Sequence, residues 1–128
     1  MKLLLDTHSF LWFIGGSDRL SAKARSLIEE PANQPLLSIA SVWEMAIKAS
    51  LGKLTLGQPF APLIQEQLDL NGIGLLGIEL NHTAVVSSLP FYHRDPFDRL
   101  LIAQAMVEQT PIVSVDGAFD AYAITRLW

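Results

Sequence analysis

Short apolar runs alternate along the chain with segments of helical periodicity, and this alternation limits the fold more than any other feature. Four runs without a helical period predict buried strands: Lys2 to Leu5, Pro35 to Ile39, Gly74 to Ile78 and Ile112 to Val115. Ala123 to Trp128 predicts a last strand. Strands that alternate with helices of roughly 10 residues pair in parallel through right-handed crossovers, with helices on both faces. We therefore expect an α/β fold, a three-layer α/β/α sandwich with a mostly parallel central sheet.

The intervening helices are predicted from apolar spacing and from the residues that flank it. Ser21 to Glu30 begins with a serine that can cap a helix and is followed by a proline. Asp95-Pro96-Phe97-Asp98 predicts the start of a helix that reaches about Gln109, because aspartate suits the N-cap and proline the first helical position. The other predicted helices are Ser41 to Leu51, Gln58 to Leu70 and Asn81 to Leu89.

Size and composition indicate one domain over residues 1–128. The chain has 128 residues, half of them hydrophobic (50%), which is enough for a core of ordinary size. It contains no cysteine, and this excludes a disulfide framework, a thiolate zinc site and a cysteine nucleophile.

The charge and the apolar N-terminus bear on partners and location. A net charge of -4 argues against a nucleic-acid binder that uses a broad basic face. Asp6 and His8 interrupt the apolar stretch at the start, and no apolar run approaches the ~18 residues of a spanning helix. We expect a soluble cytoplasmic protein with no membrane contact.

Four carboxylates that are far apart in sequence are predicted to meet at one edge of the sheet. Asp6 and Asp116 each follow an apolar strand directly, whereas Glu44 and Asp98 are expected in the first turns of helices. The carboxyl ends of parallel strands and the helix N-termini gather at the same edge. Carboxylates side by side would repel one another and raise each other's pKa unless a cation neutralised them, and such hard ligands favour Mg²⁺ or Mn²⁺.

Each acid also has a structural interpretation. Ser41 and Glu44 have the spacing of a capping box, and Glu44 with Lys48 makes a favourable i,i+4 pair. Asp6 at a strand end and Asp116 before a glycine are both compatible with turns.

Two candidate acids, Asp95 and Asp98, lie at the start of the helix predicted from Asp95 to about Gln109. Asp95 is the expected N-cap there, and a metal ligand only in second place. Asp98 shares its helical face with Leu101, Ile102 and Ala105, which would draw its carboxylate toward the core, where a charge needs a partner.

Histidines and aromatic residues give weaker indications. His8, His82 and His93 are too scattered to suggest zinc, so surface or turn roles are expected for them. The aromatic residues Trp12, Phe13 and Trp43 are expected in the core rather than in base stacking.

Basic residues near the predicted edge are candidate phosphate ligands, with Lys48 and Arg99 as the substrate-binding candidates. Lys53 and Arg94 share this interpretation, and solvated surface charge is the alternative for all four.

Four segments taken together resemble the PIN-domain toxins of the VapC type. They are Leu4-Leu5-Asp6-Thr7-His8, Ser41-Val42-Trp43-Glu44-Met45-Ala46-Ile47-Lys48, His93-Arg94-Asp95-Pro96-Phe97-Asp98-Arg99-Leu100-Leu101-Ile102-Ala103 and Val113-Ser114-Val115-Asp116. The resemblance implies that Asp6, Glu44, Asp98 and Asp116 form the catalytic acids, with Thr7 and Ser114 as supporting hydroxyls. It assigns the metal to Asp6, Asp98 and Asp116, and so selects Asp98 over Asp95. It further implies a sheet with the first strand central, a homodimer, a VapB-like antitoxin and an RNA substrate, often a transfer RNA.

The expected activity is that of a Mg²⁺- or Mn²⁺-dependent endoribonuclease, the toxin of a toxin-antitoxin pair, which leaves 5′-phosphate and 3′-hydroxyl ends. One alternative is a metal-independent ribonuclease that uses paired histidines and leaves 2′,3′-cyclic phosphates. Another is a non-catalytic module, either a PIN-like RNA-binding domain or a phosphoacceptor domain.

Overall fold

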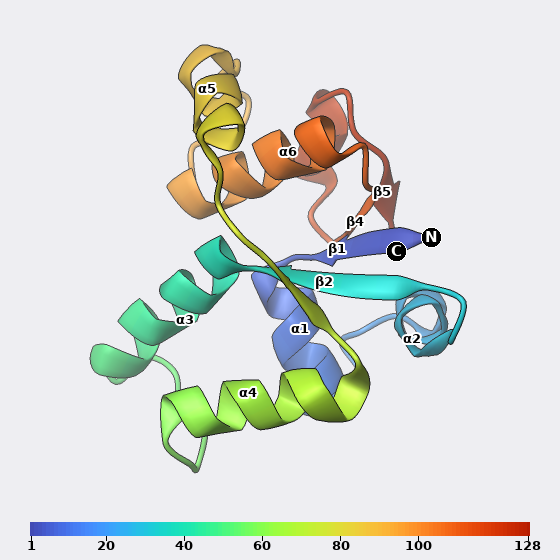
Figure 1. Cartoon of the computed structure of the whole chain (residues 1–128), viewed down its shortest axis with the longest axis vertical. Coiled ribbons are helices and arrows are strands. Elements are labelled where there is room, and N and C mark those ends of the chain that lie inside the picture. The colour runs from blue at the N-terminus through green and yellow to red at the C-terminus, as the bar shows by residue number, and fades with distance from the viewer.

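A parallel five-stranded sheet runs through the middle of the molecule (Figure 1). The computed structural model describes residues 1–128. The strands, in sheet order, are β3 (Gly74–Leu76), β2 (Gln34–Ser38), β1 (Lys2–Leu5), β4 (Ile112–Val113) and β5 (Arg126–Leu127). All neighbouring pairs are parallel and β1 is the central strand, which confirms the predicted α/β class and the central position of the first strand.

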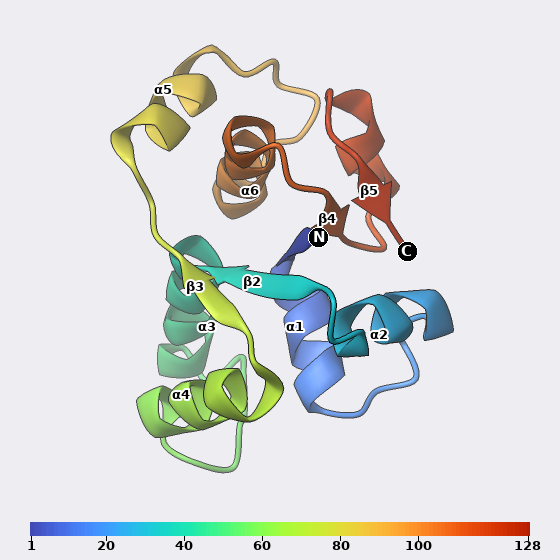
Figure 2. The same ribbon diagram turned by 45° about the vertical axis from the view of Figure 1, so that its right-hand side comes forward.

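Helices cover both faces of this sheet. They are α1 (Thr7–Ile14), α2 (Ala22–Glu29), α3 (Ile39–Ser50), α4 (Phe60–Asn71), α5 (Leu80–Ser88) and α6 (Pro96–Glu108), with the 3-10 helix η1 (Gly117–Ala121) after β4. Figure 2 shows α5 and α6 on one side of the sheet and α1, α2 and α4 on the other. None of the helices has the length and apolar character needed to cross a membrane.

The hydrophobic core has two parts, because the side chains of the central strand point alternately to the two faces of the sheet. Leu3 and Leu5 of β1 are fully buried against Phe10 of α1 and the helices of that face, whereas Leu4 is buried with Ile102 of α6 on the other. Successive strand residues point to opposite faces, so a run without polar residues is required where both faces are covered. This is the three-layer sandwich that the apolar runs predict.

The structure differs from the predicted elements in two places. Residues 7–14, for which no element is predicted, form α1 directly after β1. Helix α3 begins at Ile39 rather than at Ser41, because Ser38 takes the extended N-cap conformation and its Oγ accepts the N–H of Ala40 at 3.0 Å. The predicted capping box of Ser41 and Glu44 is therefore absent, and Glu44 lies in the second turn with its carboxylate available for other contacts.

Candidate metal centre at the carboxyl edge of the sheet

Asp6 is fixed at the point where the central strand becomes a helix. It is the N-cap of α1, and its Oδ1 accepts the N–H of Ser9 at 2.8 Å. Its own N–H donates to the carbonyl of Val113 in β4 at 3.2 Å, which ties the residue to the neighbouring strand. The residue is 5% exposed. The cap uses one carboxylate oxygen, so Oδ2 is free of protein hydrogen bonds and available to a ligand.

Glu44 is held by two neighbours on different elements. The hydroxyl of Thr7 donates to its Oε1 at 2.6 Å, and the ammonium of Lys48, one turn later on α3, donates to its Oε2 at 3.0 Å. Lys48 thus makes the i,i+4 pair that the sequence predicts. Because Thr7 follows Asp6 in the chain, this contact places Glu44 of α3 beside the start of α1, which Asp6 caps.

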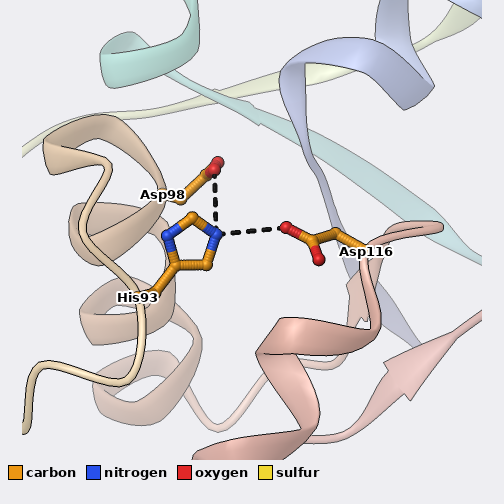
Figure 3. Close-up of side chains that lie close together, drawn as sticks. All are labelled: His93, Asp98 and Asp116. Carbon is orange, nitrogen blue, oxygen red and sulfur yellow. Dashed lines mark hydrogen bonds and ion pairs between the residues drawn. The ribbon is translucent and has the colours of Figure 1, made fainter.

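Three side chains meet at the beginning of α6 and the end of β4 (Figure 3). The Nε2 atom of His93 lies 3.3 Å from Oδ2 of Asp98 and 3.1 Å from Oδ2 of Asp116. One potential ligand atom from each of these residues lies within 4.8 Å of the others. The N–H of Asp116 donates to the hydroxyl of Ser114 at 3.0 Å, so this serine helps to fix the turn that carries the carboxylate.

The two carboxylates that share the imidazole are perturbed in opposite directions. Burial, followed by repulsion from Asp95, Asp6 and Glu44, raises the pKa of Asp98 from 3.8 to about 7, against an opposing attraction from His93. Burial also acts to raise the pKa of Asp116, but hydrogen bonds from the Ala118 N–H and from His93 outweigh it and lower the value. The repulsion felt by Asp98 shows that Asp6 and Glu44 lie within electrostatic range of it.

The comparisons with known proteins agree with this geometry. A sequence model described as PIN domain matches residues 3–124. The chain belongs to the PIN domain family. Over 70 residues, 52% of its length, it is 37% identical to Ribonuclease VapC16 of Mycobacterium tuberculosis strain ATCC 25618 / H37Rv. The match spans half (50%) of that curated relative.

Solved structures share the fold at low sequence identity. VapBC2 from Rickettsia felis, bound to a DNA fragment from its promoter, has a TM-score of 0.69 at 14% identity, with 99% of this chain and 98% of that chain covered. FitAcB from Neisseria gonorrhoeae has a TM-score of 0.67 at 19% identity, with coverage of 98% and 96%. VapBC-1 from nontypeable Haemophilus influenzae has a TM-score of 0.69 at 14% identity, with coverage of 99% and 97%. At these identities the likeness concerns the fold alone.

Arg99 has a different role in this PIN domain from the expected one. It is 5% exposed, and its guanidinium donates to the carbonyls of Val86, Leu89, Pro90 and His93. A buried guanidinium that is already bound to backbone acceptors cannot hold a substrate phosphate. Arg99 is a structural residue, whereas Lys48 remains accessible, with 39% of its side chain exposed.

The expectations for the histidines and the aromatic residues need correction in two cases. His82 is fully buried on α5 and its Nε2 lies 3.0 Å from Glu108, so it has neither a surface nor a turn role. His93 lies in the turn between α5 and α6, as expected, but its ring is among the acids. The closeness of His93 to Asp95 and Asp98 in the sequence was the one available signal. Trp43 is 58% exposed and packs edge-on against Phe97, with 5.2 Å between ring centroids, instead of lying in the core. Trp12 does pack on the core, as expected.

Asp95 takes the structural role that the sequence predicts. Its Oδ1 accepts the N–H of Asp98 at 2.9 Å and caps α6. The cap places Asp98 in the first helical turn, where its carboxylate faces the other acids. Asp95 therefore stabilises the start of α6, and Asp98 is the acid whose carboxylate faces the site.

The donor set fits a hard divalent cation. Asp98 and Asp116 supply carboxylate oxygens at one place, and Asp6 lies within electrostatic range of Asp98. Carboxylate oxygens are the ligands that Mg²⁺ and Mn²⁺ prefer. Lys48 pairs with Glu44, and His93 lies against Asp98. After burial, the negative charge of the neighbouring acids contributes to the raised pKa of Asp98. Ser41, on the same face of α3 as Glu44, is buried with a hydroxyl that has no hydrogen-bond partner. Such an orphaned group is normally satisfied by water or a ligand.

Proposed function

We propose that this PIN domain is a Mg²⁺- or Mn²⁺-dependent endoribonuclease and the toxin of a toxin-antitoxin pair. The observation that carries the proposal is that Asp98 lies beside Asp116 and within electrostatic range of Asp6 and Glu44, under enough burial and repulsion to raise its pKa to about 7. Such a site costs stability unless a cation occupies it, which is typical of a functional rather than a structural cluster. The similarity to Ribonuclease VapC16 supports RNA as the substrate.

In this proposal Asp6, Asp98 and Asp116 hold the metal. A divalent cation bound there supplies positive charge for the phosphate and makes water a better nucleophile at neutral pH. Glu44, fixed by Thr7 and Lys48, orients the attacking water by accepting a hydrogen bond from it. Water adds to phosphorus as the bond to the 3′ oxygen breaks, and that oxygen takes up a proton. The products are a 5′ phosphate and a 3′ hydroxyl, without participation of the ribose 2′ hydroxyl.

The paired-histidine alternative is disfavoured by where the histidines lie. His93 alone reaches the acids, because His82 is enclosed between α5 and α6, and His8 is exposed on α1. A general base and a general acid from two histidines would need both rings beside one phosphate.

The proposed partners are a VapB-like antitoxin, a second copy of the chain and an RNA, with transfer RNA as the first candidate. The antitoxin is supported by solved relatives of the same fold, one of which is described as a toxin-antitoxin complex from Klebsiella pneumoniae. A short reading frame immediately upstream of this one, whose product suppresses toxicity on co-expression, is the expected finding. Its absence would remove the toxin assignment and leave the nuclease.

The nuclease proposal is tested by cleavage of a total RNA pool, with mapping of the cut ends. The wild-type protein in Mn²⁺ should leave 5′-phosphate and 3′-hydroxyl ends, and excess EDTA should stop cleavage. Asp6→Asn should abolish cleavage with the fold intact, because asparagine can still cap α1. Asp69→Asn, an exposed acid on α4, is the matched control and should cleave normally. Full activity of Asp6→Asn, or of the wild type in EDTA, would refute the proposal.

A further inference from the structure

His93 lies on a segment whose backbone is fixed by two buried side chains. Its N–H donates to the hydroxyl of Tyr122 at 2.8 Å, and its carbonyl accepts from Arg99 at 3.2 Å. Tyr122 in turn donates to the carbonyl of Pro90 at 2.6 Å, and Arg99 donates to those of Leu89 and Pro90 at 3.0 and 2.9 Å. The turn between α5 and α6 is therefore held in one place, and His93 with it.

The imidazole ring is also fixed, and its hydrogen-bond partners assign the tautomer. The ring stacks on Phe119, with 5.5 Å between centroids and 29° between planes. Its Nδ1 accepts the N–H of Asp95 at 3.3 Å. Because a backbone N–H can only donate, the neutral form of the ring has its lone pair on Nδ1 and its hydrogen on Nε2. The Nε2 atom faces Asp98 and Asp116, as Figure 3 shows.

We propose that His93 is a positioning residue that is not itself a metal ligand. Its Nε2–H donates a hydrogen bond to the carboxylate of Asp116, and the same atom lies against the carboxylate of Asp98, so that His93 holds both groups in the arrangement that the cation requires. The proposal rests on the metal-dependent function above. Both contacts use Oδ2, and Oδ1 of Asp98 is free of protein hydrogen bonds. For His93 to bind a metal through Nε2, its hydrogen would have to move to Nδ1. A hydrogen on Nδ1 would point at the N–H of Asp95, so that two hydrogen-bond donors would face each other at the start of α6.

Hydrogen-bond partners of metal ligands have a measurable effect, since their loss typically reduces metal affinity about 10- to 100-fold. The test measures Mn²⁺ binding to the purified protein by electron paramagnetic resonance, with no RNA present. His93→Ala should raise the Kd for Mn²⁺ at least about 10-fold. His93→Gln, whose amide N–H can replace the lost donor, should recover part of that affinity. If the alanine variant does not fold, His93→Asn takes its place in the test. The asparagine side chain is shorter than that of glutamine, so its amide reaches less far toward the carboxylates.

His82 provides a matched control for these substitutions. Its Nδ1 accepts the N–H of Glu79 at 3.0 Å and its Nε2 lies 3.0 Å from the carboxylate of Glu108, so it has the same pattern of partners as His93. It lies between α5 and α6, away from Asp98 and Asp116. His82→Gln should lower the melting temperature and leave the Kd for Mn²⁺ unchanged, which separates a positioning effect from a general loss of stability.

Each other outcome overturns a defined part of the argument. An unchanged Kd in His93→Ala would show that the contacts of the imidazole with Asp98 and Asp116 do not affect metal binding, and a lower Kd would show that the imidazole only occupies the place of the cation. Failure of His93→Gln to recover affinity, with a selective loss of Co²⁺ relative to Mg²⁺ binding, would make His93 a ligand, because imidazole favours the softer metal. A wild-type protein that binds no Mn²⁺ but still cleaves RNA in EDTA would refute the proposed function as well.

Discussion

Replacing Asp98 with asparagine is expected to stabilise the metal-free protein at neutral pH and to remove its affinity for divalent cations. Burial, with repulsion from Asp95, Asp6 and Glu44, raises the pKa of Asp98 from 3.8 to about 7 in the folded state. In the unfolded chain the same carboxyl group titrates near its ordinary value. Asparagine has the same size and keeps an oxygen that can accept from His93, but it carries no charge.

The size and sign of this effect follow from the two pKa values of Asp98. Below about pH 4 the carboxyl is protonated in both states and contributes nothing. Between about pH 4 and about pH 7 the unfolded chain binds fewer protons than the folded one, so stability falls by ~1.4 kcal/mol per pH unit as pH rises. Over three units this amounts to about 4 kcal/mol, and it persists at higher pH. Because 26% of the Asp98 side chain is exposed, solvent screening reduces the expected gain for Asp98→Asn to about 3 kcal/mol.

Urea denaturation in EDTA measures this difference directly. The free energy of unfolding of Asp98→Asn should exceed that of the wild type by about 3 kcal/mol at pH 8, and the two should converge near pH 4. Addition of Mn²⁺ at pH 8 should stabilise the wild type and leave the variant unchanged, because only a folded protein that binds the ion gains stability from it. The reasoning is refuted if the variant is no more stable than the wild type at pH 8, or if its gain is independent of pH.

Three further outcomes are expected. Asp116→Asn should slightly destabilise the metal-free protein at neutral pH, because the pKa of Asp116 is lowered in the folded state, and the difference should be lost as pH falls below about 4. The effect is small because 42% of the Asp116 side chain is exposed. A gain in the urea midpoint would contradict it. Arg99→Met should lower the free energy of unfolding by about 3 kcal/mol or more, because the backbone carbonyls that it satisfies lose their donors, and a variant as stable as the wild type would disprove this role. Trp43→Ala should weaken binding of a single-stranded RNA about tenfold in the Asp6→Asn background, as measured by fluorescence anisotropy, with Trp43→Phe close to the parent; equal affinities would show that the ring exposed beside Phe97 does not contact RNA.

The layers of the fold were predictable because the signals for them are local. An apolar run that is buried on both faces of a sheet cannot contain polar residues, so β1 is visible in the sequence without knowledge of its neighbours. The cap of α6 is equally local, since Asp95 satisfies an N–H only three residues away. Helix α3 shows the limit of such signals: Ser38 and Ser41 are both good caps, and the end of the paired strand β2 at Ser38 decides between them.

The same difference between local and long-range signals applies to the candidate site. The order of strands and helices predicts that Asp6, Asp98 and Asp116 lie at one edge of the sheet, because the carboxyl ends of parallel strands and the starts of the helices that follow share that edge. The contacts of His93 and Arg99 could not be predicted in this way. The ring of His93 reaches a carboxylate 23 residues away, and its backbone depends on a tyrosine 29 residues away. A contact of this kind leaves no periodicity in the chain, since it exists only once the two segments have packed together.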